Sequence, residues 1–214
     1  MKYEYIKTDG ITNLESLEGT DRWYWGTDYA SGDLYEAEEL FRSGHEVNKN
    51  RLIFVSYPKG QIYEPIKAKQ GQYLGRPVCY QKEIFCLVVD FPEHKILIYK
   101  CSADMDKAEV YVKRSLDELK DCYNLMLVTE PLTLCRQGHE GRFEIVWPQK
   151  GDFCIDSRES LCLRDKDKLI FSKWYEDCGY YEETIVRKYP TGEVLEKYDG
   201  TFMAMPDGQK WILN

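Results

Sequence analysis

The chain has 214 residues, of which 43% are hydrophobic, 31% are charged and 14% are aromatic, and its net charge is −8. This composition is typical of a folded protein and excludes a disordered or membrane-embedded chain. The acidic balance, with no cluster of Lys and Arg, argues against non-specific binding to nucleic acid or to an anionic membrane surface. The N-terminal stretch MKYEYIKTDG has no apolar region typical of a signal peptide, so we expect a cytoplasmic protein.

In that compartment, the eight cysteines are expected to be reduced and buried rather than bridged. Within or beside apolar runs, Cys behaves as a small hydrophobic residue. Seven cysteines lie in such runs: Cys79, Cys86, Cys101, Cys122, Cys135, Cys154 and Cys162. The spacing of Cys135, His139, Cys154 and Cys162 matches no common zinc module. We therefore predict no metal site and no cofactor.

After a polar lead-in over residues 1–21, the aromatic alternation of residues 22–29 predicts a strand. Residues 33–44 allow two interpretations. Asp33, Glu36 and a periodic apolar face indicate a capped helix that ends at Gly44. An internal repeat favours a strand, which is the interpretation adopted here.

The repeat relates residues 22–66 to residues 173–213. Trp23 and Tyr24 match Trp174 and Tyr175, and residues 44–63 align without a gap with residues 192–211. In the second copy, β-branched residues flank a Pro-Thr-Gly turn, which predicts a hairpin. If both copies fold alike, residues 33–44 form a strand.

Four segments share one hairpin pattern, in which an apolar run reaches a proline, a polar turn follows and a second apolar run begins. They are residues 54–66, 87–99, 143–155 and 201–213. In the last of them, Phe202 and Trp211 are expected to anchor the core. Further short strands fill the sequence between the repeats, and the best helical pattern is at residues 115–123, where Ser115 and Glu118 could form a capping box.

The segment Met205-Pro206-Asp207-Gly208-Gln209-Lys210-Trp211 resembles the S-P-D-G-K hairpin of many β-propeller repeat families. In that hairpin, Pro-Asp-Gly sets a tight turn. The resemblance implies an all-β, β-propeller-like fold with about four or five small blades, to which the capping pattern adds one short helix near 115–123. The strand pattern alone also fits a bent antiparallel meander or a sandwich. No linker interrupts the sequence, so we predict a single all-β domain over residues 1–214.

No catalytic constellation stands out. The three histidines, His45, His94 and His139, accompany no nucleophile motif. A glycosidase would need two converging carboxylates, and the abundance of acidic residues alone does not show convergence.

The remaining feature is a pairing of aromatic and acidic residues in both repeat copies. Such residues suit a protein, peptide or carbohydrate ligand. The candidate ligand-binding residues are Trp25, Asp28, Tyr29, Trp174, Tyr175 and Asp177. On a strand, Trp23 and Trp25 share one face and Tyr24 lies on the other, so at most half of the first cluster can be exposed.

We therefore expect a non-enzymatic binding or scaffold protein that presents an aromatic and acidic surface. The alternatives are a carboxylate-dependent, glycoside hydrolase-like enzyme and a structural assembly subunit. Neither nucleic acid nor a membrane is expected as a partner.

Overall fold

A computed structural model of the chain describes residues 3–28, 32–46, 50–176, 179–205 and 207–214. Contacts divide the chain into two compact units, Met1–Leu127 and Val128–Asn214. Each unit is described by itself below, and the single-domain organisation stays a prediction.

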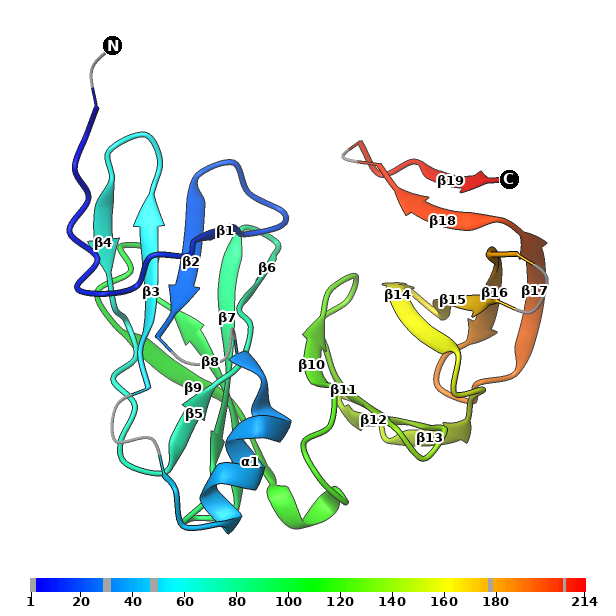
Figure 1. Cartoon of the computed structure of the whole chain (residues 1–214), viewed down its shortest axis with the longest axis horizontal. Helices are drawn as coiled ribbons and strands as arrows, with labels where there is room; N and C mark the ends of the chain where they lie inside the picture. The colour runs from blue at the N-terminus through cyan, green and yellow to red at the C-terminus, as the bar shows by residue number, and fades with distance from the viewer. Residues whose placement is uncertain (1–2, 29–31, 47–49, 177–178, 206) are drawn as a thin grey trace. The chain divides into compact units, whose positions relative to one another are not determined.

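The N-terminal unit contains two antiparallel sheets (Figure 1). The first has the order β1 (Glu15–Ser16), β2 (Trp23–Thr27), β3 (Leu52–Ser56) and β4 (Gln61–Tyr63). The second has the order β5 (Gln72–Leu74), β7 (Glu83–Asp90), β8 (Lys95–Cys101) and β9 (Ala108–Ser115), and β6 (Val78–Tyr80) also pairs with β7.

Two more four-stranded sheets and a separate hairpin follow. The third sheet starts at the unit boundary with β10 (Leu125–Val128) and continues through β11 (Thr133–Gly138), β12 (Arg142–Trp147) and β13 (Gly151–Cys154). The fourth consists of β14 (Glu159–Asp165), β15 (Lys168–Tyr175), β16 (Tyr181–Lys188) and β17 (Val194–Asp199). The chain ends in the two-stranded sheet of β18 (Thr201–Ala204) and β19 (Lys210–Leu213).

The predicted all-β, propeller-like class is confirmed in the make-up of the sheets, because four small antiparallel sheets follow one another along the chain. All four predicted hairpins form, as β3–β4, β7–β8, β12–β13 and β18–β19. They do not occupy equivalent places: β7–β8 lies in the middle of its sheet, whereas β3–β4 and β12–β13 end theirs. The proline-turn pattern therefore marks a hairpin but not its place within a sheet.

The core of the N-terminal unit is built on the alternation predicted for β2. Trp23 and Trp25 are buried, and Tyr24 on the opposite face is 38% exposed. The ring of Trp23 contacts Phe54 and Tyr63 edge-on, at centroid distances of 6.5 and 5.3 Å. Among the described aromatic residues of the first cluster, the predicted alternation of buried and exposed faces is therefore confirmed.

In the C-terminal unit the core is built around three phenylalanines. Phe143 lies 5.2 Å from both Phe153 and Phe171, measured between ring centroids. The prediction that Phe202 and Trp211 anchor the core was wrong for Trp211, which is 44% exposed, while Phe202 is half-buried. Among the described strands, β18 and β19 pair only with each other, and a two-stranded hairpin cannot bury both of its faces.

Residues 33–44 form a helix, so the strand adopted for them was wrong. The helix is α1 (Leu34–Arg42), and the Asp33 carboxylate accepts hydrogen bonds from the N–H groups of Tyr35 and Glu36, at 2.9 and 3.2 Å. At the other end, Gly44 has φ +73°, and a Schellman motif closes the helix. Its two bonds run from Gly44 N–H to the Phe41 carbonyl (3.1 Å) and from His45 N–H to the Leu40 carbonyl (2.9 Å).

The buried face of α1 includes a carboxylate, Glu38. Its oxygens accept the backbone N–H of Cys122 at 2.6 Å and pair with Arg42 at 2.5 Å. A buried charge is stable when it is bonded in this way. The contact joins residues 84 positions apart within the N-terminal unit.

Replacement of Asp33 by Ala is expected to lower the free energy of unfolding by about 1 kcal/mol, because two N–H groups of the first turn lose their acceptor. Urea denaturation followed by circular dichroism would measure the change. Asp33→Ser is the matched control, since it retains a capping oxygen and should unfold close to the wild type. Equal stability of Asp33→Ala and the wild type would show that the cap contributes nothing.

The helix predicted near residues 115–123 is a single 3-10 turn, η2 (Leu116–Glu118). Ser115 does cap it, by accepting the Asp117 N–H at 3.3 Å. Glu118, however, contacts the side chain of Arg114 at 3.0 Å. The sequence pattern therefore predicted the cap correctly, but only one helical turn follows it.

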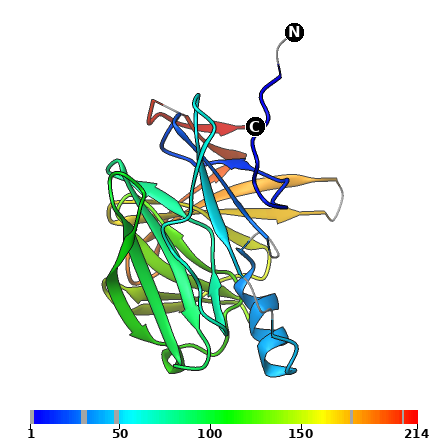
Figure 2. The same ribbon diagram turned by 90° about the vertical axis from the view of Figure 1, so that its left-hand side faces the viewer.

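Both views place α1 at one end of the N-terminal unit and the extended residues 3–8 at the other (Figures 1 and 2). Tyr3 and Tyr5 are almost wholly exposed there. In the part of the chain that the structure describes, no helix has the length and apolar character needed to cross a membrane.

Candidate functional site

The hairpin of β15 and β16 ends in a group of aromatic side chains. The strands pair so that Tyr175 lies opposite Tyr181 and Trp174 lies opposite Glu182. Because residues directly opposite each other project to the same face, the two tyrosines share one face and Trp174 lies with Glu182 on the other. Trp174 is 39% exposed and Tyr181 is 54% exposed.

The two tyrosines form a parallel stack. Their ring centroids are 4.5 Å apart and their planes differ by 5°. The guanidinium of Arg158 lies 4.8 Å from the Tyr175 centroid, so a cation also contacts this ring. Lys173 Nζ also lies 5.2 Å from this centroid, so Tyr175 is contacted by Tyr181 and by two cations, whereas much of Tyr181 is open to solvent.

Arg158 is itself fixed by a carboxylate. Asp156 accepts a bond from Arg158 Nε at 3.1 Å and pairs with Lys173 Nζ at 2.9 Å. These contacts, the Arg158 side-chain bond first, hold the pKa of Asp156 well below its usual range. Asp156, Arg158 and Lys173 therefore form a charged network beside Tyr175, and the Asp156 carboxylate stays ionised at neutral pH.

Carboxylates accept the phenol groups beside the stack. The Tyr175 hydroxyl donates to Glu183 at 2.5 Å, and the Tyr180 hydroxyl donates to Glu182. The bond from Tyr180 lowers the pKa of Glu182, and the bonds to Glu183 and Glu182 raise the pKa values of Tyr175 and Tyr180. At neutral pH the phenols are protonated and Glu182 is an anion.

Of the candidate residues predicted in the second repeat copy, Trp174 and Tyr175 lie together at this hairpin end, and Asp177 lies outside the described residues. In the first copy, Trp25 is 5% exposed within the core, Asp28 accepts the N–H of Arg51 at 2.7 Å, and Tyr29 lies outside the described residues. A buried Trp25 offers no surface to a ligand in this conformation.

Sequence reasoning missed Arg158. The residue contacts Tyr175 only because β14 pairs with β15, with Glu159 opposite Lys173. The two strands form a local hairpin, but Arg158 precedes β14, and the strand pattern does not show which ring a residue beyond the strand end will contact.

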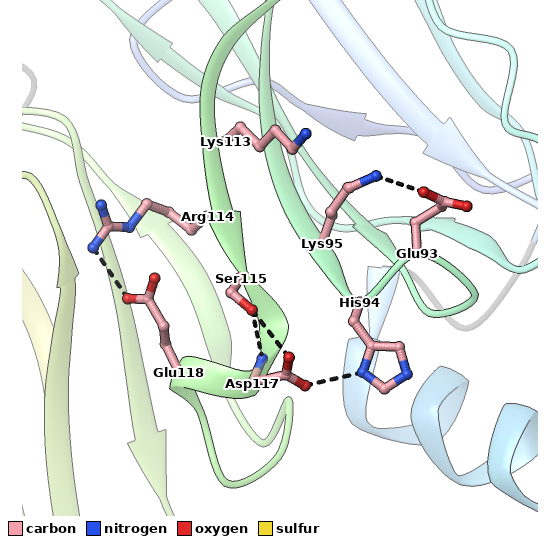
Figure 3. A pocket seen from close by; sticks show the side chains of 8 residues that line it. All are labelled: Glu93, His94, Lys95, Lys113, Arg114, Ser115, Asp117 and Glu118. Atoms are coloured by element: carbon pink, nitrogen blue, oxygen red, sulfur yellow. Dashed lines mark hydrogen bonds and ion pairs between the residues drawn. The ribbon is translucent and has the colours of Figure 1, made fainter.

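A second candidate is a cavity of about 440 Å³ at the end of β8 and β9 (Figure 3). Its lining residues are Glu93, His94, Lys95, Lys113, Arg114, Ser115, Asp117 and Glu118. In Figure 3, dashed lines join Lys95 to Glu93, Arg114 to Glu118, and Asp117 to both His94 and Ser115.

This cavity contains a Ser, a His and an Asp, but not in a nucleophilic arrangement. His94 Nδ1 lies 3.0 Å from Asp117 Oδ1, and the Ser115 hydroxyl donates to Asp117 Oδ2 at 3.2 Å. The serine therefore faces a carboxylate, whereas nucleophile activation requires an imidazole base beside it.

Two carboxylates of the cavity, Asp117 and Glu93, have pKa values shifted away from what a general acid needs. The His94 bond lowers the pKa of Asp117, and the Lys95 bond lowers the pKa of Glu93. A glycosidase acid needs a carboxyl group whose pKa is raised. These two groups are shifted in the opposite direction.

All the described cysteines are free thiols. As predicted, Cys86, Cys101, Cys122 and Cys135 are buried, and Cys79 is partly buried. Burial raises the pKa of the Cys122 and Cys135 thiols well above the usual value, so they are poor nucleophiles. The prediction of a buried position was wrong for Cys154 and Cys162, which are exposed on β13 and β14, the edge strands of their sheets.

No known protein-family model matches this chain, and a search of the curated proteins found no similar sequence.

Proposed function

We propose that this is a binding protein whose β15–β16 hairpin recognises a basic, arginine-bearing segment of a partner protein. The observation that carries the proposal is the stack of Arg158, Tyr175 and Tyr181, whose outer ring is 54% exposed. An incoming guanidinium on Tyr181 would extend the stack by one more planar cation, as Arg158 already does on Tyr175.

The charges around the stack support a cationic ligand. Glu183 lies two positions from Tyr181, and therefore on the same face of β16, and accepts the Tyr175 hydroxyl, whereas Glu182 lies with Trp174 on the opposite face. The whole chain carries a net charge of −8, which favours the approach of basic segments. A neutral sugar could stack on the same ring and donate hydroxyl hydrogen bonds to a carboxylate, but it would gain no charge–charge attraction.

Replacement of Tyr181 by Ala is expected to weaken binding of a synthetic arginine-rich peptide by about fivefold, or ~1 kcal/mol, because the exposed cation–π contact is lost. Isothermal titration calorimetry would measure the dissociation constants. Tyr181→Phe keeps the ring and should bind like the wild type. The matched control is Tyr5→Ala, which removes an exposed tyrosine from the N-terminal unit and should change nothing.

A peptide with citrulline in place of arginine is the ligand control, since it keeps the shape and loses the charge. The proposal predicts much weaker binding of this peptide and a loss of arginine-peptide binding in high salt. Equal binding of both peptides, an unchanged constant for Tyr181→Ala, or binding of an oligosaccharide alone would contradict it.

A further inference from the structure

We propose that two copies of this chain associate through the outer edges of their β17 strands. All six residues of β17 are exposed, including Leu195 and Tyr198. The strand is the last in its sheet and pairs only with β16 among the described strands. An open strand edge is a template for another strand.

The backbone of β17 shows which residues face outward. Gly200 donates its N–H to the Glu182 carbonyl at 2.8 Å, and Tyr198 lies opposite Thr184, two positions along the ladder. In an antiparallel ladder, inward-bonded and outward-facing residues alternate. The peptide groups of Lys197 and Asp199 therefore point to the open edge.

The charges of Lys197 and Asp199 favour a second copy of the chain as the partner. They also favour one register of the two antiparallel β17 strands. In a symmetric antiparallel pair, outward-facing residues must lie opposite outward-facing residues. With the twofold axis at Tyr198, Lys197 of each copy lies opposite Asp199 of the other, which gives two ion pairs. An axis at Lys197 or at Asp199 instead places like charges opposite each other, which is destabilising.

The two charged side chains are available for this pairing. Within the described part of the chain, neither Lys197 nor Asp199 forms an ion pair, whereas the neighbouring Glu196 contacts Lys168 at 3.1 Å. A lysine on an edge strand usually opposes strand addition. Here the lysine has a partner in one register, because Asp199 of the second copy lies opposite Lys197 when the twofold axis is at Tyr198.

The same register places Tyr198 opposite its own copy on the twofold axis. This is a position without inter-copy hydrogen bonds, where opposite side chains come closest, about 4.5 Å between Cα atoms. An aromatic pair at such a position adds to strand association. The contact is short, so we expect a weak, reversible dimer.

Sedimentation equilibrium of the full chain tests the proposal, with dimer expected to increase as concentration rises. Lys197→Asp and Asp199→Lys each place like charges in both cross-copy pairs and should raise the dissociation constant about tenfold or more. The double variant Lys197→Asp/Asp199→Lys restores opposite charges and should restore the wild-type constant. Circular dichroism checks that each variant folds.

Three results would overturn the proposal: a monomer at every concentration for the wild type, single variants that dimerise like the wild type, or a double variant that stays as weak as the singles. Trp211→Ser distinguishes an interface at β17 from one at the β18–β19 hairpin, because it changes the exposed face of that hairpin and leaves β17 intact. It should dimerise normally, and loss of the dimer in this variant would assign the interface to the C-terminal hairpin instead.

Discussion

Replacement of Arg136 by Ala is expected to lower the free energy of unfolding of the C-terminal unit by about 3 kcal/mol or more. The Arg136 side chain is wholly buried and donates to Glu140 at 2.7 Å and to Glu144 at 2.6 Å. Its removal leaves a cavity and two carboxylates without their counter-charge. Both carboxylates are about one quarter exposed, so water can take over part of the lost interaction.

Urea denaturation would measure this change, and hydrogen exchange over residues 128–214 would locate it. Arg136→Lys retains the charge but not the planar fork, so it should unfold between the wild type and Arg136→Ala. Lys188→Ala is the control for an exposed ion pair, Lys188–Glu193 at 4.0 Å, and should change stability by less than about 0.5 kcal/mol. A loss from Arg136→Ala no larger than that of Lys188→Ala would refute the structural role given to Arg136.

Gly192→Ala is expected to destabilise the same unit by about 2–5 kcal/mol, the sum of a backbone and a packing penalty. Gly192 has φ +73°, where a Cβ costs energy in any surroundings. A Cβ at this position would also lie 2.1 Å from Cγ of Phe153. Because Phe153 packs against Phe143 and Phe171, the ring cannot move without disturbing the core.

Gly208→Ala separates the two penalties. Gly208 has φ +87°, but a Cβ there meets nothing within 4 Å. This variant should therefore lose only the backbone part, about 1–2 kcal/mol. Thermal unfolding of both variants would measure the difference, and equal losses would mean that Phe153 does not restrict position 192.

The hairpins were predictable because turn chemistry is local. A proline, a few polar residues and two flanking apolar runs are enough to specify an antiparallel pair, and all four such segments form one. The alternation in β2 was predictable for the same reason, since side-chain direction on a strand depends only on position.

The helix α1 shows the limit of arguing from a repeat. Its cap and its C-terminal glycine are visible in the sequence, yet the similarity to residues 173–213 favoured a strand. The matching pair Tyr35-Glu36 lies in a helix, and Tyr181-Glu182 lies in β16. Local capping bonds decided the structure, because the first copy has Asp33 and a helical apolar face that the second copy lacks.

Burial and site assembly depend on neighbours that the sequence does not identify. Trp211 has the pattern of a core residue, but among the described strands its hairpin pairs with no third strand. Trp23 and Trp174 match in the repeat, yet Trp23 is buried in a core and Trp174 is 39% exposed at the end of a hairpin. Arg158 precedes β14 and reaches Tyr175 at the open end of the β14–β15 hairpin, and the strand pattern does not show which ring a residue beyond the strand end will contact.

The contact between Glu38 and the Cys122 N–H has a consequence for biosynthesis. During translation, α1 leaves the ribosome long before the residue that satisfies its buried carboxylate. Until Cys122 emerges, docking of α1 would place a charge in the core with only Arg42 to balance it. We therefore expect α1 to stay solvated, and the folding of the N-terminal unit to stay incomplete, until nearly all of this unit has been synthesised.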